Sequence, residues 1–349
     1  MRMSMSMRTS RIIVTGGSGF IGTNLIQHLS DGGHEVLNID IRHPKNSAAP
    51  GSFVQADILD PHVLAETVRD FDPQYIVHLA ARTDLDGTTD RDYTANIEGI
   101  SNMVAAAKVA PKLKRAIFAS SMYVCKLGYI PRRDDDYCPH TAYGHSKQVG
   151  EQLVRQQAGD QFSWTLVRPT SIWGPWFDVP YRGFFNTVRK GFYVHPNGYE
   201  IRRSYGFVLN TVVQISRLLE VEEDNTVHGK VFYVADYEPT DPLDWAQTIA
   251  DRFGSRHVRR VPIAAMRLGA RVGDLLKSAG MRNPPLSSFR LNNLLTSAVF
   301  DLDSTKRVAG DLPYTMKEGV QITVDWMRRQ EGANHGCANH VCANDGCVN

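Results

Sequence analysis

The sequence predicts an α/β protein built on a doubly wound parallel sheet, with a smaller C-terminal substrate-binding region. Short apolar runs alternate with helical patterns through the first half of the chain, and a glycine-rich turn joins the first run to the first helix. From about residue 175 the pattern changes to a stretch rich in Pro, Gly, aromatic residues and Arg. Strands that alternate with helices favour right-handed crossovers and a parallel sheet covered on both faces.

The apolar runs give the expected strands, which are 11–15, 34–40, 74–80, 115–121, 164–174 and 230–236. The first amphipathic stretch ends at Gly32 and Gly33, which terminate a helix. Asp241 followed by Pro242 is typical of a helix start, and much of the chain beyond it has a helical pattern. We expect a sheet domain at 8–170, rejoined by 204–236, a second region at 171–203 and 237–331, and a flexible tail at 332–349.

Composition excludes several classes of protein. The 349 residues carry 39 Lys and Arg against 37 Asp and Glu, so the net charge is only +2 and nucleic acid is not an expected partner. No apolar run approaches the roughly 18–20 residues of a membrane span, and the N-terminus does not look like a signal peptide. Only Cys125 and Cys138 lie in the main body, unlike a secreted disulfide framework. We therefore expect a cytoplasmic protein with no membrane partner.

The glycine-rich turn has the spacing of a dinucleotide-binding motif. Gly16, Gly19 and Gly22 follow the first strand and open the first helix, around Phe20 and Ile21. The first glycine allows the turn, the second lets a pyrophosphate approach the backbone, and the third lets helix and strand pack closely. The alternative is a glycine-rich turn without a ligand, but the strand before and the helix after it favour a cofactor.

Asp40 closes the second expected strand, about 20 residues after the glycines. A carboxylate there accepts hydrogen bonds from a ribose 2′-hydroxyl and repels a 2′-phosphate, which favours NAD over NADP. Arg42, two residues later, counts against this preference, because a guanidinium can accept the phosphate.

A candidate catalytic pair follows in the sequence Tyr143-Gly-His-Ser-Lys147, where a phenol and an ammonium share one helix face. Tyrosine in water has a pKa of about 10 and is a poor base, but a nearby ammonium and a cationic nicotinamide ring would lower it. Tyr143 would then exchange a proton with a hydroxyl while a hydride moves to or from the cofactor. Ser121, at the end of an expected strand, would hold the reacting hydroxyl, and Lys147 would bind the nicotinamide ribose.

Together these motifs resemble the extended short-chain dehydrogenase/reductases, and within them the NAD-dependent nucleotide-sugar epimerase/dehydratase family. The resemblance covers about residues 10–330. It implies a Rossmann domain with a C-terminal substrate domain, a nucleotide-diphosphate sugar as substrate and a homodimer paired through a helix bundle. It also assigns further residues: Asp57 and Ile58 beside the adenine, Leu79, Ala80 and Ala81 along the cofactor, and Thr83 near the substrate.

The later motifs match the family less closely. Ser171 stands where the family usually has an Asn that contacts the substrate phosphate, and Arg203 falls on the arginine that usually binds the diphosphate, with Arg202 as a neighbouring alternative. Planar guanidinium groups suit bidentate phosphate contacts.

The resemblance leaves several reactions open. Dehydration needs an extra acid and base, whereas Ser121 is followed by Met122, Tyr123 and Val124, without a carboxylate. C4 epimerisation through a transient keto-sugar, with Tyr143 as base, is therefore our first expectation, in a setting such as polysaccharide biosynthesis. The alternatives are an NAD(P)-dependent keto-sugar reductase or dehydrogenase, and a non-catalytic nucleotide-binding module.

Other residues receive no functional assignment. Cys337, Cys342 and Cys347 with His335 and His340 have ligand types that suit zinc, but their spacing is wide, so we expect a tail without metal. We interpret the Asp134–Asp136 run as solvated surface and His78 as a core residue. The aromatic residues between Trp173 and Phe185 are equally consistent with core packing and with stacking on a nucleotide base.

Overall fold

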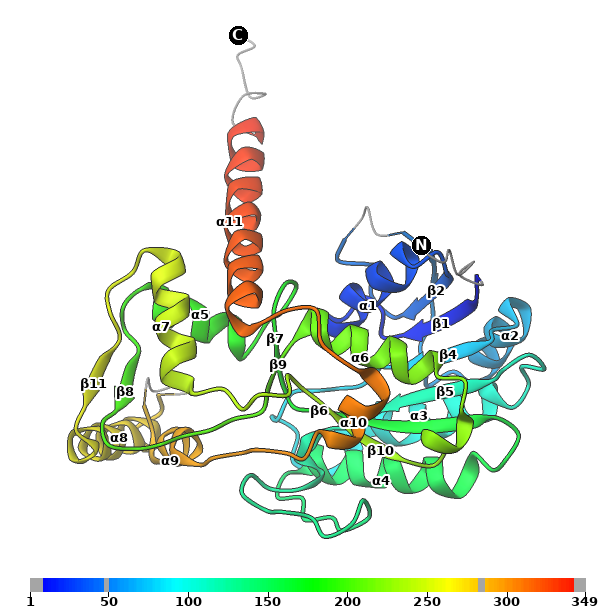
Figure 1. The fold of residues 1–349 in the computed structure, drawn as a ribbon, viewed down its shortest axis with the longest axis horizontal. Coiled ribbons are helices and arrows are strands. Elements are labelled where there is room, and N and C mark those ends of the chain that lie inside the picture. The colour runs from blue at the N-terminus through cyan, green and yellow to red at the C-terminus, as the bar shows by residue number, and fades with distance from the viewer. Residues whose placement is uncertain (1–8, 47–49, 282–285, 342–349) are drawn as a thin grey trace, which may run out of the picture.

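A seven-stranded parallel sheet forms the centre of the protein in a computed structural model that describes residues 9–46, 50–281 and 286–341 (Figure 1). Its strand order is β10-β6-β5-β4-β1-β2-β3, and every neighbouring pair is parallel. The strands are β1 (Arg11–Thr15), β2 (Glu35–Asp40), β3 (Ser52–Gln55), β4 (Tyr75–His78), β5 (Arg115–Ala119), β6 (Ser163–Pro169) and β10 (Val231–Val234). The predicted doubly wound fold is therefore confirmed.

Helices cover both faces of this sheet. One face packs against α1 (Phe20–Asp31) and α6 (Val208–Glu220), and the other packs against α2 (Pro61–Phe71), α3 (Thr94–Ala107) and α4 (Ala142–Gln157). Strand β1 shows the division, because Ile12 and Val14 belong to one core and Ile13 to the other. All three are fully buried, as expected for a parallel strand between two helical layers.

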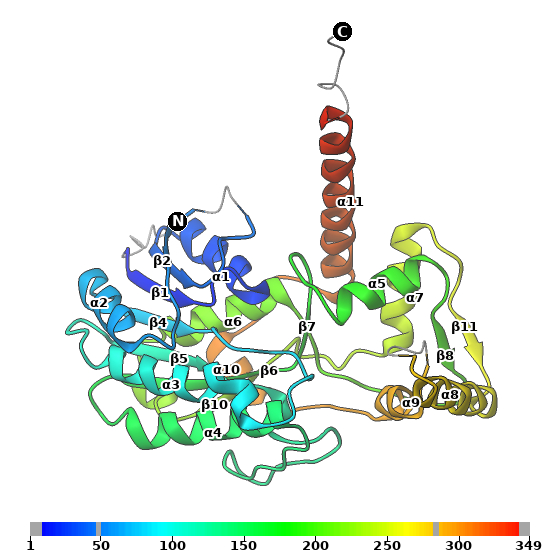
Figure 2. The same cartoon turned by 180° about the vertical axis from the view of Figure 1, so that it is seen from behind.

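The second region projects from the carboxyl side of the sheet and is assembled from discontinuous segments (Figures 1 and 2). It contains two small parallel pairs, β7 (Ser171–Trp173) with β9 (Tyr205–Phe207) and β8 (Val194–Pro196) with β11 (Arg259–Val261). The remaining helices are α5 (Tyr181–Arg189), α7 (Pro242–Phe253), α8 (Ile263–Ser278), α9 (Ser288–Leu295), α10 (Asp303–Ala309) and α11 (Met316–Val341). Short 3-10 turns span Asp90–Tyr93, Met122–Val124 and Asp224–Thr226.

Several local predictions can be compared directly. Asp241 caps α7 by accepting a hydrogen bond from the amide of Leu243, and Gly32 follows the end of α1, as predicted. The expected strand 164–174 is instead broken at Thr170, and its second half pairs with β9 outside the main sheet. Strand β3 was not predicted, because this four-residue edge strand is half exposed and its apolar pattern is weak.

The C-terminal segment also differs from the expected flexible tail. Helix α11 runs on to Val341 and extends away from the rest of the molecule (Figure 1). Residues 342–349, including Cys342 and Cys347, lie outside the described residues. No helix in the described ranges is both long and apolar enough to cross a membrane.

Candidate active site

The glycine-rich turn leads directly from β1 into α1 and forms a cradle that only glycine allows. Gly16 has a φ of +71°, and a Cβ at Gly22 would lie 2.3 Å from the carbonyl oxygen of Gly16. The helix starts at Phe20 after Gly19, and no side-chain cap accepts from the amides of its first turn, which includes Phe20 and Ile21. Uncapped amides at a helix start bind phosphate oxygens, and these residues therefore fit a dinucleotide.

Asp40 lies beside this turn at the end of β2. Its buried carboxylate accepts hydrogen bonds from the amides of Ser18 and Arg42, each at 3.0 Å. The Nε atom of Arg42 lies 3.8 Å from the same carboxylate, while its side chain is two-thirds exposed. The carboxylate is thus held next to the phosphate cradle, where it can accept from a ribose hydroxyl.

The other predicted cofactor residues follow the carboxyl ends of β3 and β4. Asp57 is exposed and accepts from the amide of Leu59 at 2.9 Å, whereas Ile58 is buried against Gly99. Leu79, Ala80 and Ala81 are partly buried, and Gly16 lies so close that its Cβ would meet the backbone of Ala80 at 2.6 Å. Thr83 is exposed in the loop that follows. The sheet therefore brings all these segments to the edge that carries the glycine turn.

The predicted catalytic residues meet at the carboxyl end of β5. Tyr143 and Lys147 lie one turn apart on α4, and both side chains are buried. A hydrogen bond joins the hydroxyls of Ser121 and Tyr143, and the Nζ atom of Lys147 donates to the carbonyl oxygen of Ala119 at 3.0 Å. Strand carboxyl ends are where ligands bind in open parallel sheets, so this grouping has the geometry of a proton-transfer site.

The pKa of Tyr143 differs from the expectation. Burial raises it to about 12, with the hydrogen bond from Ser121 acting in the opposite direction. The rings of Tyr93 and Tyr123 lie 5.9 and 6.1 Å from that of Tyr143, which accounts for the apolar surroundings. Lys147 is not among the groups that shift this pKa in the protein alone, where its ammonium donates to the carbonyl oxygen of Ala119, and its effect in the loaded site stays a prediction. Burial also lowers the pKa of Lys147 to about 8, although the charge of Glu151 raises it.

The sequence reasoning missed Glu151, which lies one turn after Lys147 on the same face of α4. Its carboxylate accepts from the hydroxyl of Ser120 at 2.5 Å, from Tyr137 at 2.9 Å and from two nitrogen atoms of Arg168 at 2.8 Å. Glu151 and Arg168 are both fully buried. The signal was available, because positions 143, 147 and 151 repeat at helical spacing and a charged residue on that buried face requires a partner.

Arg203 and Ser171 lie in the second region. The buried guanidinium of Arg203 donates to the carbonyl oxygen of Asn293, while its Nε atom has no partner. Its charge lowers the pKa values of Tyr123, Tyr181, Tyr193 and Tyr205, although burial raises each of them overall. Ser171 in β7 is hydrogen-bonded to Tyr181. The structure therefore surrounds Arg203 with tyrosines, a grouping that the sequence did not reveal.

The described part of the aromatic segment fits core packing. Trp173, Phe177 and Phe185 are buried in the core, and Tyr181 packs against it and contacts Tyr205, while stacking on a nucleotide base stays a prediction. His78 is a core residue, as predicted; burial, and to a smaller extent the charge of Lys147, lowers its pKa to about 3. Among the described side chains, no three His, Cys, Asp or Glu residues come together as a possible metal site.

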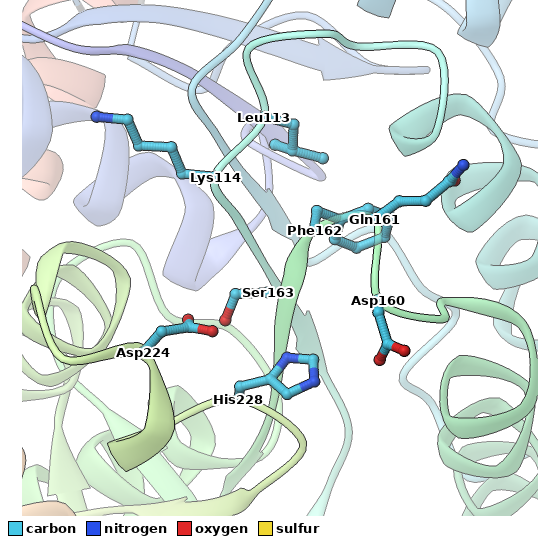
Figure 3. Close-up of a pocket in the computed structure, with 8 residues that line it drawn as sticks. All are labelled: Leu113, Lys114, Asp160, Gln161, Phe162, Ser163, Asp224 and His228. Atoms are coloured by element: carbon cyan, nitrogen blue, oxygen red, sulfur yellow. The ribbon is translucent and has the colours of Figure 1, made fainter.

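A surface depression of about 370 Å³ lies elsewhere and is not part of this site (Figure 3). Its lining includes Lys114, Phe162 and His228, which come just before β5, β6 and β10. These are the amino-terminal ends of the strands, opposite to the edge that carries Ser121.

Comparison with known proteins decides the family. Residues 12–228 match the model of the NAD dependent epimerase/dehydratase family. The chain belongs to this family. Its cofactor is therefore NAD, and it is an enzyme of the epimerase and oxidoreductase type.

Individual relatives of this family member differ in activity. This chain is 29% identical over 269 residues to a 3 beta-hydroxysteroid dehydrogenase/Delta 5→4-isomerase of Mycobacterium tuberculosis, and the match covers 72% of each chain. It is 24% identical to N-acetyl-alpha-D-glucosaminyl-diphospho-ditrans,octacis-undecaprenol 4-epimerase of Escherichia coli O157:H7, covering 90% of this chain and 94% of the relative. The fold matches that of the Bordetella bronchiseptica enzyme WbmG in complex with NAD and UDP, with a TM-score of 0.69, 23% identity and coverage of 92% and 96%.

Proposed function

We propose that this family member is a nucleotide-sugar epimerase that inverts C4 through a transient keto-sugar. The observation that carries the proposal is the state of Arg203. Arg203 as a whole is only 9% exposed, its Nε atom has no partner, and no carboxylate in the described part of the chain forms an ion pair with it. A buried cation without a counter-ion is costly, and the diphosphate of a nucleotide sugar would supply the missing charge and acceptors.

The catalytic residues suit a reversible oxidation of a sugar hydroxyl. NAD, held by the glycine turn and Asp40, would supply a reversible hydride acceptor. Tyr143 takes the hydroxyl proton and gives it back, while the Ser121 hydroxyl, which is bonded to Tyr143 in the protein alone, would donate to the reacting oxygen. Lys147 donates hydrogen bonds beside them and keeps a positive charge near the phenol, which favours phenolate when the site is loaded. The keto-sugar must rotate within the site, so that the hydride returns to the opposite face of C4.

The relatives support a sugar diphosphate as the substrate class. The Escherichia coli relative is named as a 4-epimerase of a sugar joined to a diphosphate, and the solved Bordetella enzyme holds UDP with NAD. The Thr170–Trp173 segment, where Ser171 replaces the usual Asn, leaves a smaller polar group near the substrate than a typical family member has.

A second candidate is the oxidation of an apolar secondary alcohol with net formation of NADH. The side chains near Arg203 include a stacked pair, Phe184 on Trp245, with ring centroids 4.8 Å apart. Tyr193 packs edge-on against Phe184 and Tyr205 lies against the buried Trp245, so this cluster is largely apolar. The similarity to a hydroxysteroid dehydrogenase of Mycobacterium tuberculosis also supports this second candidate.

Product analysis separates these candidates. The purified protein is incubated with UDP-hexoses without added cofactor, and the products are analysed by chromatography and mass spectrometry. An isomer of unchanged mass without net NADH supports the epimerase. Product only with added NAD or NADP supports a keto-sugar oxidoreductase, and NADH formed from a 3β-hydroxysteroid alone supports the second candidate.

The Arg203→Met variant then tests the role of the guanidinium. We expect KM for the UDP-sugar to rise about 10- to 100-fold, the effect of losing charge-assisted hydrogen bonds. The KM for an uncharged alcohol should change little, so equal losses with both substrates would contradict the proposal.

We also propose the homodimer that the family resemblance implies, which analytical ultracentrifugation of the purified chain tests.

A further inference from the structure

Helix α8 exposes four large apolar side chains to solvent, more than it buries. Its packed face carries Met266, Ala270 and Gly273; Met266 and Ala270 join a small core with Leu291 of α9, and Ile263 packs against that core. On the opposite face, Leu268 is 64% exposed, Leu275 69%, Val272 52% and Leu276 39%. An ordinary surface helix has the reverse arrangement, so this apolar face needs a partner.

The charges around this face are positive and unpaired. Arg267 and Arg271 are exposed along one edge of it, and neither forms an ion pair with any residue that the structure describes. The one carboxylate of α8, Asp274, accepts a hydrogen bond from the amide of Ser288 at the start of α9. Arg259 and Arg260 on β11 precede the helix and are also exposed. The region is strongly basic although the whole chain carries a net charge of only +2.

We propose that the exposed face of α8 docks on the surface of an anionic lipid bilayer. Leu268, Val272 and Leu275 would enter the boundary between headgroups and acyl chains, and Arg267 and Arg271 would contact anionic headgroups. An amphipathic helix with leucines on one side and arginines at the border is the sequence pattern of such interfacial binding.

The position of α8 allows this contact. The helix lies with α9 at the end of the second region that is farthest from the seven-stranded sheet, and both views place it at the periphery (Figures 1 and 2). A second copy of the chain is a poorer occupant, because a symmetric contact across this face would bring the unpaired arginines of both copies together. The expected absence of a membrane partner rested on the lack of a spanning segment, and a helix lying on the surface does not need one.

Vesicle flotation of the purified full-length protein tests this proposal. We expect the protein to float with vesicles of phosphatidylcholine and phosphatidylglycerol but not with phosphatidylcholine alone. The bound fraction should fall as salt rises, because the attraction to anionic headgroups is screened. No flotation with the anionic vesicles above the neutral ones would overturn the proposal.

Two double variants examine the two parts of the contact. Leu268→Ser with Leu275→Ser removes the apolar part, and Arg267→Glu with Arg271→Glu reverses the charge. Each double variant should reduce the partition coefficient of the protein onto the anionic vesicles about tenfold or more. Each basic side chain near the membrane surface contributes ~1 kcal/mol to the free energy of binding. Ile130→Ser, which changes another exposed apolar residue, and the pair Arg69→Glu and Lys108→Glu serve as matched controls and should bind as the unchanged protein does.

The remaining measurements establish what a loss of binding means. An unchanged melting temperature and unchanged NAD binding show that a variant is folded. Vesicle binding is measured without substrate, and activity is measured without vesicles, so a failure of the proposed function does not affect this test. If the α8 variants instead bind vesicles normally, or turn a dimer into a monomer without lipid, the face contacts something other than a bilayer and the proposal is wrong.

Discussion

Arg168 donates two hydrogen bonds of 2.8 Å to the carboxylate of Glu151, and both side chains are fully buried. Burial alone would lower the pKa of Arg168, but the hydrogen bonds and charge of Glu151 raise it above its usual value, so the guanidinium stays charged. Ser120 donates to the same carboxylate, next to Ser121, and Lys147 lies one turn before it. The ion pair therefore joins α4 to β6, and the hydrogen bond from Ser120 ties the carboxyl end of β5 to the same carboxylate.

Glu151→Gln should change the pH dependence of the reaction as well as its rate. The carboxylate raises the pKa of Lys147 against the lowering by burial, so its removal should lower that pKa below about 8. If Lys147 acts in its charged form, the basic limb of the kcat profile moves to lower pH. The measurement is kcat against pH for both proteins, with Glu98→Gln on the exposed surface of α3 as control.

A loss of folding would confuse this result, because removing one partner of a buried ion pair costs roughly 3–5 kcal/mol. Ser120→Ala is the milder companion, since it removes one hydrogen bond to Glu151 and keeps the ion pair. A basic limb that stays in place in a folded Glu151→Gln protein would show that Glu151 only stabilises the fold.

Tyr143→Phe tests the assigned base. The substitution keeps the ring that packs against Tyr93 and Tyr123 and removes the hydroxyl bonded to Ser121. We expect kcat to fall by about 10²–10⁴, the usual contribution of general acid–base catalysis, with little change in NAD affinity. Steady-state kinetics and a fluorescence titration with NAD give the two quantities, and activity near that of the unchanged protein would rule out Tyr143 as the base.

The sequence was informative where a function depends on local spacing. Gly16, Asp40 and the Tyr143–Lys147 pair could be predicted because a turn, a strand end and a helix face are each set within a few residues. The surroundings of Arg203 could not, because Tyr123, Tyr181, Tyr193 and Tyr205 come from separate segments. The strand expected at 164–174 failed for a related reason, since an apolar run does not indicate that its second half leaves one sheet for another.

Asp40→Asn should weaken the preference for NAD over NADP. The amide oxygen can still accept from the amide of Ser18, whereas the amide nitrogen cannot accept from the amide of Arg42, and the charge that repels a 2′-phosphate is lost. Arg42, whose Nε atom now lies 3.8 Å from the carboxylate, would become available to that phosphate. We expect the ratio of the two Kd values to shift about tenfold or more toward NADP, the order of one charge-assisted contact. A calorimetric titration with each nucleotide measures the ratio, and an unchanged ratio would argue against Asp40 as the selective residue.

Asp236 should make the stability of the protein depend on pH below neutrality. It accepts hydrogen bonds from the amide of Phe207 at 3.1 Å and from Asn210 at 2.7 Å, yet burial raises its pKa from 3.8 to about 6. A carboxyl whose pKa is higher in the folded state binds its proton more tightly there. Its contribution to the free energy of unfolding is therefore complete below about pH 3.8 and is lost as the pH rises through about 6.

Urea unfolding of the unchanged protein and Asp236→Asn between pH 4 and 7 measures this contribution. The variant loses one hydrogen bond at every pH, because its amide nitrogen would face the Nδ2 donor of Asn210. That loss is constant, so the informative quantity is the difference in free energy of unfolding between the two proteins at each pH. We expect the advantage of the unchanged protein to shrink by on the order of 2 kcal/mol from pH 4 to pH 7. A difference that stays constant or grows with pH would show that Asp236 is ionised in the folded protein throughout this range.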